Sequence, residues 1–165
     1  MKPKHDSMRG WFFATLHEEM SKDDRIWLIT ADLGYGALDS IRDDFPNRFI
    51  NTGASEQAVV GISVGLALLG TIPFVYSITP FLLYRPFEWH RNYLNHERIA
   101  VKLVGTGLDR DYEKDGITHH AEDAKQVLAC LPNIKCFWPA TKEECPAALQ
   151  AMLTNGQPSF IALRR

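Results

Sequence analysis

The segment Arg48-Phe49-Ile50-Asn51-Thr52-Gly53-Ala54-Ser55-Glu56-Gln57, which leads into the apolar run Ala58–Gly70, decides the fold of this chain. A short apolar strand at Phe49–Ile50 is followed by a glycine-containing turn and then by a helix of small apolar residues. A helix that is apolar on all sides must be buried or packed against a partner. The segment therefore predicts a strand and a helix that belong to a well-packed α/β core.

Glu56 stands in the first turn of that predicted helix. The helix dipole stabilises an anion there, whereas the apolar wall behind the side chain favours a neutral acid. A carboxyl group held between these opposing effects can exchange a proton with a bound ligand. The residues alone also allow a simpler interpretation, in which Glu56 is the N-terminal capping acid of a core helix.

Strand-like and helical segments alternate along the whole chain. The predicted strands are Arg25–Thr30, Phe49–Ile50, Ile72–Ser77, Ile99–Val104, Ile134–Phe137 and Ser159–Leu163. The predicted helices are Met8–Met20, the helix that starts at Ser55, Phe81–Tyr93, Glu122–Leu131 and Lys142–Leu153. This alternation predicts an α/β fold with three α/β/α layers and a mostly parallel sheet of about six strands. At 165 residues we expect a single domain over 1–165, with its core at about 8–164.

The composition argues against several classes of protein. Hydrophobic residues make up 45% and charged residues 23%, as in globular proteins, and the net charge of −2 gives no electrostatic basis for binding nucleic acid or an anionic membrane. Val59–Leu69 is too short to cross a bilayer, and Met1–Asp6 lacks the apolar core of a signal peptide. Three cysteines without metal-ligand spacing indicate reduced thiols. We therefore expect a cytoplasmic protein with no metal ligands of its own.

Three loops, 32–36, 52–56 and 105–120, follow predicted strand ends and should open on the same edge of the sheet. In open α/β sheets that edge binds ligands. The first loop offers Asp32, and the third offers the run Asp115–His120, of which one histidine could face a ligand. Ordinary explanations remain open: Asp32 suits a turn, and Thr118 could cap a short helix that carries two surface histidines.

Phe81 and Tyr84 lie three residues apart at a predicted strand-to-helix junction, so their rings would share one helix face. Such rings could stack on a flat heterocycle, although an ordinary core helix contains the same residues. The glycine-rich motifs that bind phosphate, and the context of a serine nucleophile elbow, do not occur in the sequence. Hydrolases and dinucleotide-binding enzymes are therefore disfavoured.

Together these motifs resemble the pyrimidine-binding (middle) domain of the transketolase family, whose members use thiamine diphosphate. The resemblance covers about Met8 to Arg164, and its motifs occur in the family's order. Beyond the segment quoted first, they are Ile29–Leu33, Pro73–Tyr76, Phe81–Asn92, Lys102–Gly105, Asp115–His120 and Leu131–Ile134. The resemblance implies the thiamine-diphosphate-binding fold of the pyrimidine type.

The resemblance also implies how the cofactor would be held. Glu56 aligns with the glutamate that hydrogen-bonds N1′ of the aminopyrimidine and promotes the tautomer that deprotonates the thiazolium. That chemistry needs a carboxyl group that can hold a proton in a dry environment. Phe81 aligns with the aromatic residue that stacks on the pyrimidine. Tyr84 and Ile78 are expected to complete the cofactor-binding set.

For the substrate, the resemblance implies a second set of residues. His119 aligns with a histidine that reaches the sugar substrate, and we expect it to take part in catalysis with Glu56. Asp32 and Asp115 align with acidic residues that line the channel. Arg9 aligns with a basic residue near the distal phosphate of the substrate.

The chain departs from the family pattern in places. Tyr84-Arg85-Pro86 stands where relatives usually carry Gly-Arg-Ala, and Gly36 stands where many carry a phosphate-contacting serine. The Gly-Asp-Gly motif that holds the diphosphate and Mg²⁺ does not occur here. We therefore expect a subunit of a split enzyme, with the Mg²⁺ ligands on a diphosphate-binding partner subunit. We expect a homodimer or heterotetramer, with its interface on Ala58–Gly70 around Gly61 and Gly65.

The expected activity is transfer of a two-carbon ketol unit, or a related acyl anion equivalent, between sugar or small carbonyl substrates. An alternative is a split subunit with an activity like 1-deoxyxylulose-5-phosphate synthase or a keto-acid decarboxylase. A further alternative of a different class is a non-catalytic assembly module that keeps the fold.

Overall fold

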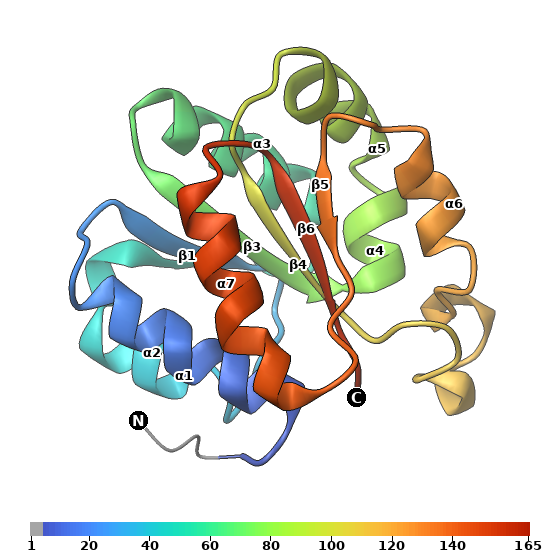
Figure 1. Ribbon diagram of the computed structural model, residues 1–165, viewed down its shortest axis with the longest axis horizontal. Coiled ribbons are helices and arrows are strands. Elements are labelled where there is room, and N and C mark those ends of the chain that lie inside the picture. The colour runs from blue at the N-terminus through green and yellow to red at the C-terminus, as the bar shows by residue number, and fades with distance from the viewer. Residues whose placement is uncertain (1–4) are drawn as a thin grey trace.

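The strands that the sequence predicts form one parallel sheet in the computed structural model, which describes residues 5–165 (Figure 1). The first four residues of the predicted domain lie outside the described part. The strand order is β2-β1-β3-β4-β6-β5, and every pair of neighbours is parallel. The strands are β1 Ile26–Thr30, β2 Phe49–Asn51, β3 Ile72–Ile78, β4 Lys102–Thr106, β5 Lys135–Phe137 and β6 Ser159–Leu163. The predicted fold class is confirmed.

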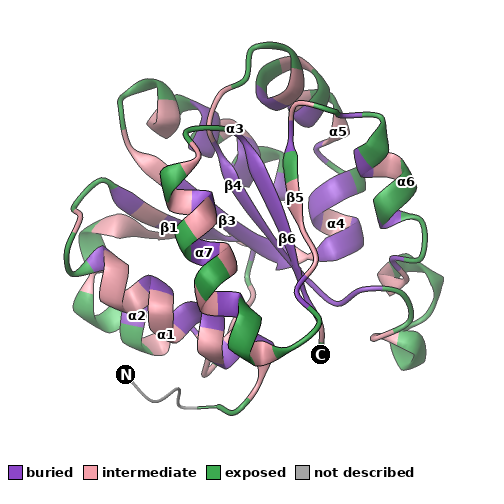
Figure 2. Cartoon of the chain, viewed as in Figure 1, coloured by how far each residue is buried: buried purple, intermediate pink, exposed green. Residues whose placement is uncertain are grey.

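Helices connect the strands and cover both faces of the sheet (Figure 1). The α-helices are α1 Met8–Met20, α2 Asp39–Asp44, α3 Glu56–Leu68, α4 Thr79–Tyr84, α5 Phe87–Trp89, α6 Ala124–Ala129 and α7 Cys145–Thr154. Successive strand residues point to opposite faces. On β1, Leu28 belongs to the cluster formed with α1, α2 and α7, whereas Ile29 belongs to the cluster formed with α3, α4 and α6. The central strands are therefore buried on both sides (Figure 2).

The predicted helix over Phe81–Tyr93 is wrong in its boundaries. Helix α4 begins earlier, at Thr79, with Pro80 in its first turn, and it ends at Tyr84. Pro86 then interrupts the helical ladder because proline has no backbone N–H to donate. After the single turn of α5, the chain continues as a π-helical segment over His90–His96. Phe81 and Tyr84 remain together on the short helix α4.

Two further elements, β4 and α2, differ from the prediction. The strand expected at Ile99–Val104 pairs only from Lys102 and continues to Thr106, because its register follows β3. Helix α2, at Asp39–Asp44, was not predicted. Six residues with one buried side chain, Ile41, carry too little periodicity to indicate a helix.

Lys102, the first residue of β4, is a titratable side chain whose burial should affect how stability depends on pH. Its side chain is buried, and Nζ donates to Asn155 Oδ1 at 2.9 Å and to the Gln157 carbonyl at 2.5 Å. Burial lowers the pKa of Lys102 from 10.5 to about 8. The folded state therefore binds this proton more weakly than the unfolded chain does. The stability gained from deprotonation of Lys102 is therefore complete above the pKa of Lys102 in the unfolded chain. It is lost as the pH falls through the pKa of Lys102 in the folded protein.

We expect the free energy of unfolding to gain up to about 3 kcal/mol from Lys102 between roughly pH 8 and pH 10.5. Urea unfolding of the natural chain and of Lys102→Met at several pH values measures this contribution, because methionine cannot titrate. Equal pH dependence in the two proteins would contradict the shift.

Within residues 5–165, no helix is long and apolar enough to cross a membrane.

Candidate functional site

Glu56 is the first residue of α3 and is only 3% exposed. Ser77 Oγ, from the end of β3, donates to Glu56 Oε1 at 3.0 Å. Arg85 Nη1, from just beyond α4, donates to Glu56 Oε2 at 2.7 Å. The carboxyl group thus bonds side chains from other elements, in addition to its place in the first turn of α3. A buried carboxylate requires such partners, because an unpaired charge would be costly to bury.

Phe81, on α4, extends this set of contacts. The guanidinium carbon of Arg85 lies 3.7 Å from the centroid of the Phe81 ring. The ring of His119 meets Phe81 edge-on, with centroids 4.8 Å apart and an interplanar angle of 64°. Five residues are therefore joined at the carboxyl edge of the sheet, and we call them the Glu56 site. They are Glu56, Ser77, Phe81, Arg85 and His119.

Tyr84 and Ile78, the two other predicted cofactor-binding residues, flank this site. Ile78 is the last residue of β3, immediately before α4. The Tyr84 hydroxyl donates to Asp123 Oδ1, which ties α4 to the start of α6. Burial, together with the neighbouring Asp123 carboxylate, raises the pKa of Tyr84 well above its usual range.

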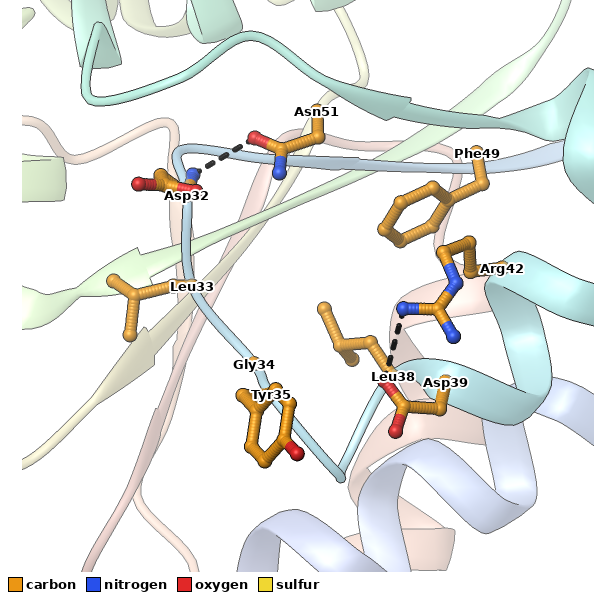
Figure 3. A pocket seen from close by; sticks show the side chains of 9 residues that line it. All are labelled: Asp32, Leu33, Gly34, Tyr35, Leu38, Asp39, Arg42, Phe49 and Asn51. Carbon is orange, nitrogen blue, oxygen red and sulfur yellow. Dashed lines mark hydrogen bonds and ion pairs between the residues drawn. The ribbon is translucent and has the colours of Figure 1, made fainter.

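Asp32 lies on a separate part of the same edge. Its backbone is left-handed, with φ of 54°, and its N–H donates to Asn51 Oδ1 at 2.9 Å. Asp32 lines a pocket in which Arg42 and Asp39 lie across from Asn51 (Figure 3). This pocket shares no lining residue with the open pocket at Glu56, whose walls are Ala54, Ser55, Glu56, Gln57 and Arg85. The structure therefore does not bring Asp32 into contact with the Glu56 site.

Arg9 and Asp115 also lie apart from Glu56. Burial disfavours the charge of Arg9, but its interactions with the Tyr76 and Tyr112 hydroxyls prevail and raise its pKa. The centroid of the Tyr112 ring lies 6.2 Å from the centroid of the His119 ring. Asp115 is exposed on the 3₁₀ turn Glu113–Asp115. Of the predicted residues, the structure thus joins Glu56, Phe81 and His119.

Sequence reasoning missed two members of the site. In the sequence, Ser77 is only the last residue of a predicted strand, and Arg85 is only part of a departure from the family motif. A signal for Ser77 was available, because it is a polar residue at the carboxyl end of a buried strand. Arg85 gave no local signal, since its contacts with Glu56 and Phe81 depend on the break after α4. Within residues 5–165, no cluster of three or more His, Cys, Asp or Glu side chains could hold a metal ion.

A parallel sheet whose carboxyl edge carries a buried carboxyl group and an aromatic ring, joined by one guanidinium, has the layout of a ligand-binding α/β domain. A family model described as the pyrimidine-binding domain of transketolase matches residues 6–165. The chain therefore belongs to the transketolase pyrimidine-binding domain family.

Individual relatives agree with this assignment. The chain is 28% identical over 159 residues to the 6-deoxy-6-sulfo-D-fructose transketolase subunit SqwH of Clostridium sp. (strain MSTE9), covering 96% of this chain and 49% of that protein. It is 34% identical over 154 residues to 1-deoxy-D-xylulose-5-phosphate synthase of Lawsonia intracellularis (strain PHE/MN1-00), covering 91% of this chain and 23% of that enzyme.

A solved structure, a split-gene transketolase described as an inactive beta4 tetramer, superposes with a TM-score of 0.84. Its sequence identity to this chain is 28%, and the match covers 96% of this chain and 52% of that one. The chain thus spans about half the length of SqwH and of the split-gene protein, and a smaller part of the synthase.

Proposed function

We propose that this chain supplies the pyrimidine-binding half of a thiamine-diphosphate-dependent, transketolase-like transferase. The enzyme would move a two-carbon ketol unit, or a related acyl anion equivalent, between sugar or small carbonyl substrates. One observation carries the proposal: a buried carboxyl group, Glu56, and the ring of Phe81 share one planar neighbour, the Arg85 guanidinium, at the carboxyl edge of the sheet. Membership of the family supports the same assignment.

The residues of the Glu56 site fit an aminopyrimidine. Such a ring is flat and carries nitrogen atoms on its edge, and it needs both an apolar face and an acidic partner. Phe81 offers the face, and Glu56 Oε2 is an acceptor that already binds a planar nitrogen group, the guanidinium of Arg85. When bound, thiamine diphosphate would supply a carbanion centre that accepts the two-carbon unit.

The residues of this chain have distinct proposed roles. Glu56 would hold or move a proton at N1′ of the aminopyrimidine, and its burial keeps water from competing for that proton. Phe81 would orient the ring, and Ser77 would fix the Glu56 carboxyl group through its 3.0 Å hydrogen bond. His119, whose ring contacts Phe81, would reach the substrate next to the cofactor. Asp32, Asp115 and Arg9 would line the channel farther from the cofactor.

The diphosphate and Mg²⁺ would be held by a second domain, which we propose is a partner subunit. The names of the relatives support this arrangement, because SqwH is called a transketolase subunit and the superposed structure is called a split-gene protein. Reduced thiols at Cys130, Cys136 and Cys145 support a cytoplasmic location.

Calorimetric titration tests this proposal. Thiamine diphosphate with Mg²⁺ would be titrated into this chain alone, and then into a mixture with a subunit that carries the Gly-Asp-Gly motif. We expect tight, Mg²⁺-dependent binding only in the mixture, because the chain alone offers contacts to the pyrimidine and the partner holds the diphosphate. Tight Mg²⁺-dependent binding to the chain alone would contradict the split arrangement. No binding in either sample, with the partner folded, would favour a non-catalytic module.

The exposed face of α3 is the proposed interface. Ile62 is 40% exposed, Leu68 70% and Leu69 82%. The two glycines of the predicted interface, Gly61 and Gly65, have different surroundings. A methyl group at Gly61 would lie 3.1 Å from the Trp89 ring, so Gly61 serves packing inside the domain, whereas Gly65 faces open space. Contiguous exposed apolar residues of this kind favour association.

Leu69→Asp should reduce the assembly, alone or with its partner, to a smaller species, because a charge would be buried at the interface. Light scattering coupled to gel filtration measures the mass. Tyr35→Asp is the matched control, because Tyr35 is also fully exposed but lies in the loop after β1. An unchanged mass for Leu69→Asp would remove this face from the interface.

A second candidate activity, similar to that of 1-deoxyxylulose-5-phosphate synthase, is favoured by the 34% identity to the synthase of Lawsonia intracellularis. It would use the same Glu56 and Phe81 contacts with a keto-acid donor. Release of carbon dioxide by the assembled enzyme distinguishes it, because ketol transfer between sugars releases none.

A further inference from the structure

Arg85 makes both of the contacts that the proposed cofactor ring would need. Its guanidinium lies over the ring of Phe81, 3.7 Å from the centroid, and donates to Glu56 Oε2 at 2.7 Å. The ring of His119 also contacts Phe81, with the two rings tilted by 64°. A flat ligand that stacks on Phe81 and bonds Glu56 would therefore compete with the guanidinium for the same place.

The chemistry of the two groups explains why one can replace the other. A guanidinium is planar, donates N–H bonds along its edge and stacks on aromatic faces. An aminopyrimidine is planar too, and it presents nitrogen atoms along its edge to a carboxyl group. The guanidinium therefore satisfies the buried Glu56 when no ligand is present, which avoids an unpaired buried charge.

Arg85 can leave the site while Glu56 cannot. The Arg85 side chain is 45% exposed, whereas the Glu56 side chain is 3% exposed. The Arg85 backbone is held separately, because its carbonyl accepts a hydrogen bond from Gln57 Nε2 at 3.1 Å. Rotation of the side chain into solvent would open the site without unfolding the end of α4.

We propose that Arg85 is a built-in occupant of the aminopyrimidine site, which the cofactor must displace on binding. The inference rests on the proposed function. It makes Arg85 a residue that sets the apparent affinity for the cofactor, because only the fraction of molecules with Arg85 turned out can bind the ring. Arg85 also keeps Glu56 paired until the ring arrives.

The test is a titration of the full chain with 4-amino-2-methylpyrimidine, which needs no diphosphate site, followed by NMR. We expect Arg85→Met to bind this compound roughly tenfold more tightly than the natural chain, the gain expected if about one molecule in ten is open. Guanidinium ion at low millimolar concentration, against equal NaCl, should compete with the compound in Arg85→Met and have no effect on the natural chain. Equal or weaker binding by Arg85→Met would overturn the proposal.

Two further variants, Arg91→Met and Arg85→Lys, serve as a control and as a replacement for Arg85→Met. Arg91→Met is the matched control, because Arg91 is exposed on the following helical segment and bonds only its neighbour Asn92 within the described residues. It should bind like the natural chain. If Arg85→Met does not fold, Arg85→Lys replaces it. Lysine keeps the charge but lacks the planar group, so Arg85→Lys should also bind more tightly than the natural chain, and failure to do so would count against the proposal.

Failure of this inference can be told apart from failure of the proposed function. Phe81→Ala and Glu56→Gln, each made in the Arg85→Met background, should abolish binding of the compound. If they do so while Arg85→Met gives no gain, only the role of Arg85 is rejected. If the compound binds and neither substitution weakens it, the Glu56 site does not bind the pyrimidine, and both proposals fall.

Discussion

Glu56→Gln is expected to lower turnover of the assembled enzyme by roughly 10²–10⁴-fold, the range typical of a lost acid–base group. Glutamine keeps the shape of the side chain. Its carbonyl oxygen can still accept from Arg85 and its amide can donate to the Ser77 hydroxyl, but it cannot exchange a proton with the aminopyrimidine. Assembly should therefore survive while the cofactor is no longer activated. The measurement is steady-state turnover with the partner subunit, together with the mass of the complex.

Glu88→Gln is the matched control, because Glu88 is an exposed acid in α5. It should leave turnover unchanged. Hydrogen–deuterium exchange at C2 of bound thiamine diphosphate separates activation of the cofactor from later steps, and Glu56→Gln should slow this exchange. Undiminished turnover and exchange in Glu56→Gln would remove Glu56 from the mechanism.

Phe81→Ala should weaken binding of thiamine diphosphate to the complex by about 1–3 kcal/mol, because stacking and apolar burial are lost together. The natural residue stacks on a planar group already, as the 3.7 Å separation from Arg85 shows. Calorimetry at fixed Mg²⁺ measures the change in affinity.

Phe45→Ala provides a control with the same kind of contact, since the Arg48 guanidinium lies 4.6 Å from the Phe45 ring centroid. Phe45 belongs to the cluster on the opposite face of the sheet, beside α1. Its removal should lower stability without a specific effect on cofactor affinity. If Phe81→Ala binds the cofactor as tightly as the natural complex does, Phe81 is a core residue and no more.

Several elements could be predicted because their signals are local. The strand at Ile26–Thr30 reads as a short run of apolar residues, and the apolar run after Glu56 is long enough to indicate a helix. The alternation of strands and helices then required a parallel sheet, which the structure confirms. Family membership followed from the order of motifs that are each weak alone, and it is confirmed as well.

Other elements could not be predicted, because their signals are weak or depend on distant contacts. Pro86 was visible in the sequence, but whether it would merely bend the helix after Phe81 or end it depended on packing around His90. The His90 ring is buried and bonds the Leu82 carbonyl at 2.7 Å. That contact spans eight residues and holds the π-helical segment against α4. Helix periodicity cannot reveal an interaction of this kind.

By itself, the sequence determined the α/β class, the family and the place of Glu56 at the start of an apolar helix, because strand and helix periodicity and motif order are properties of the chain alone. Only the tertiary structure decided what the Glu56 carboxyl group contacts. Ser77 lies 21 residues away along the chain and Arg85 lies 29 residues away, and both reach Glu56. A buried charge takes its partners from whatever the packed elements bring within a few ångströms, so the identity of those partners is fixed by packing and not by spacing along the sequence.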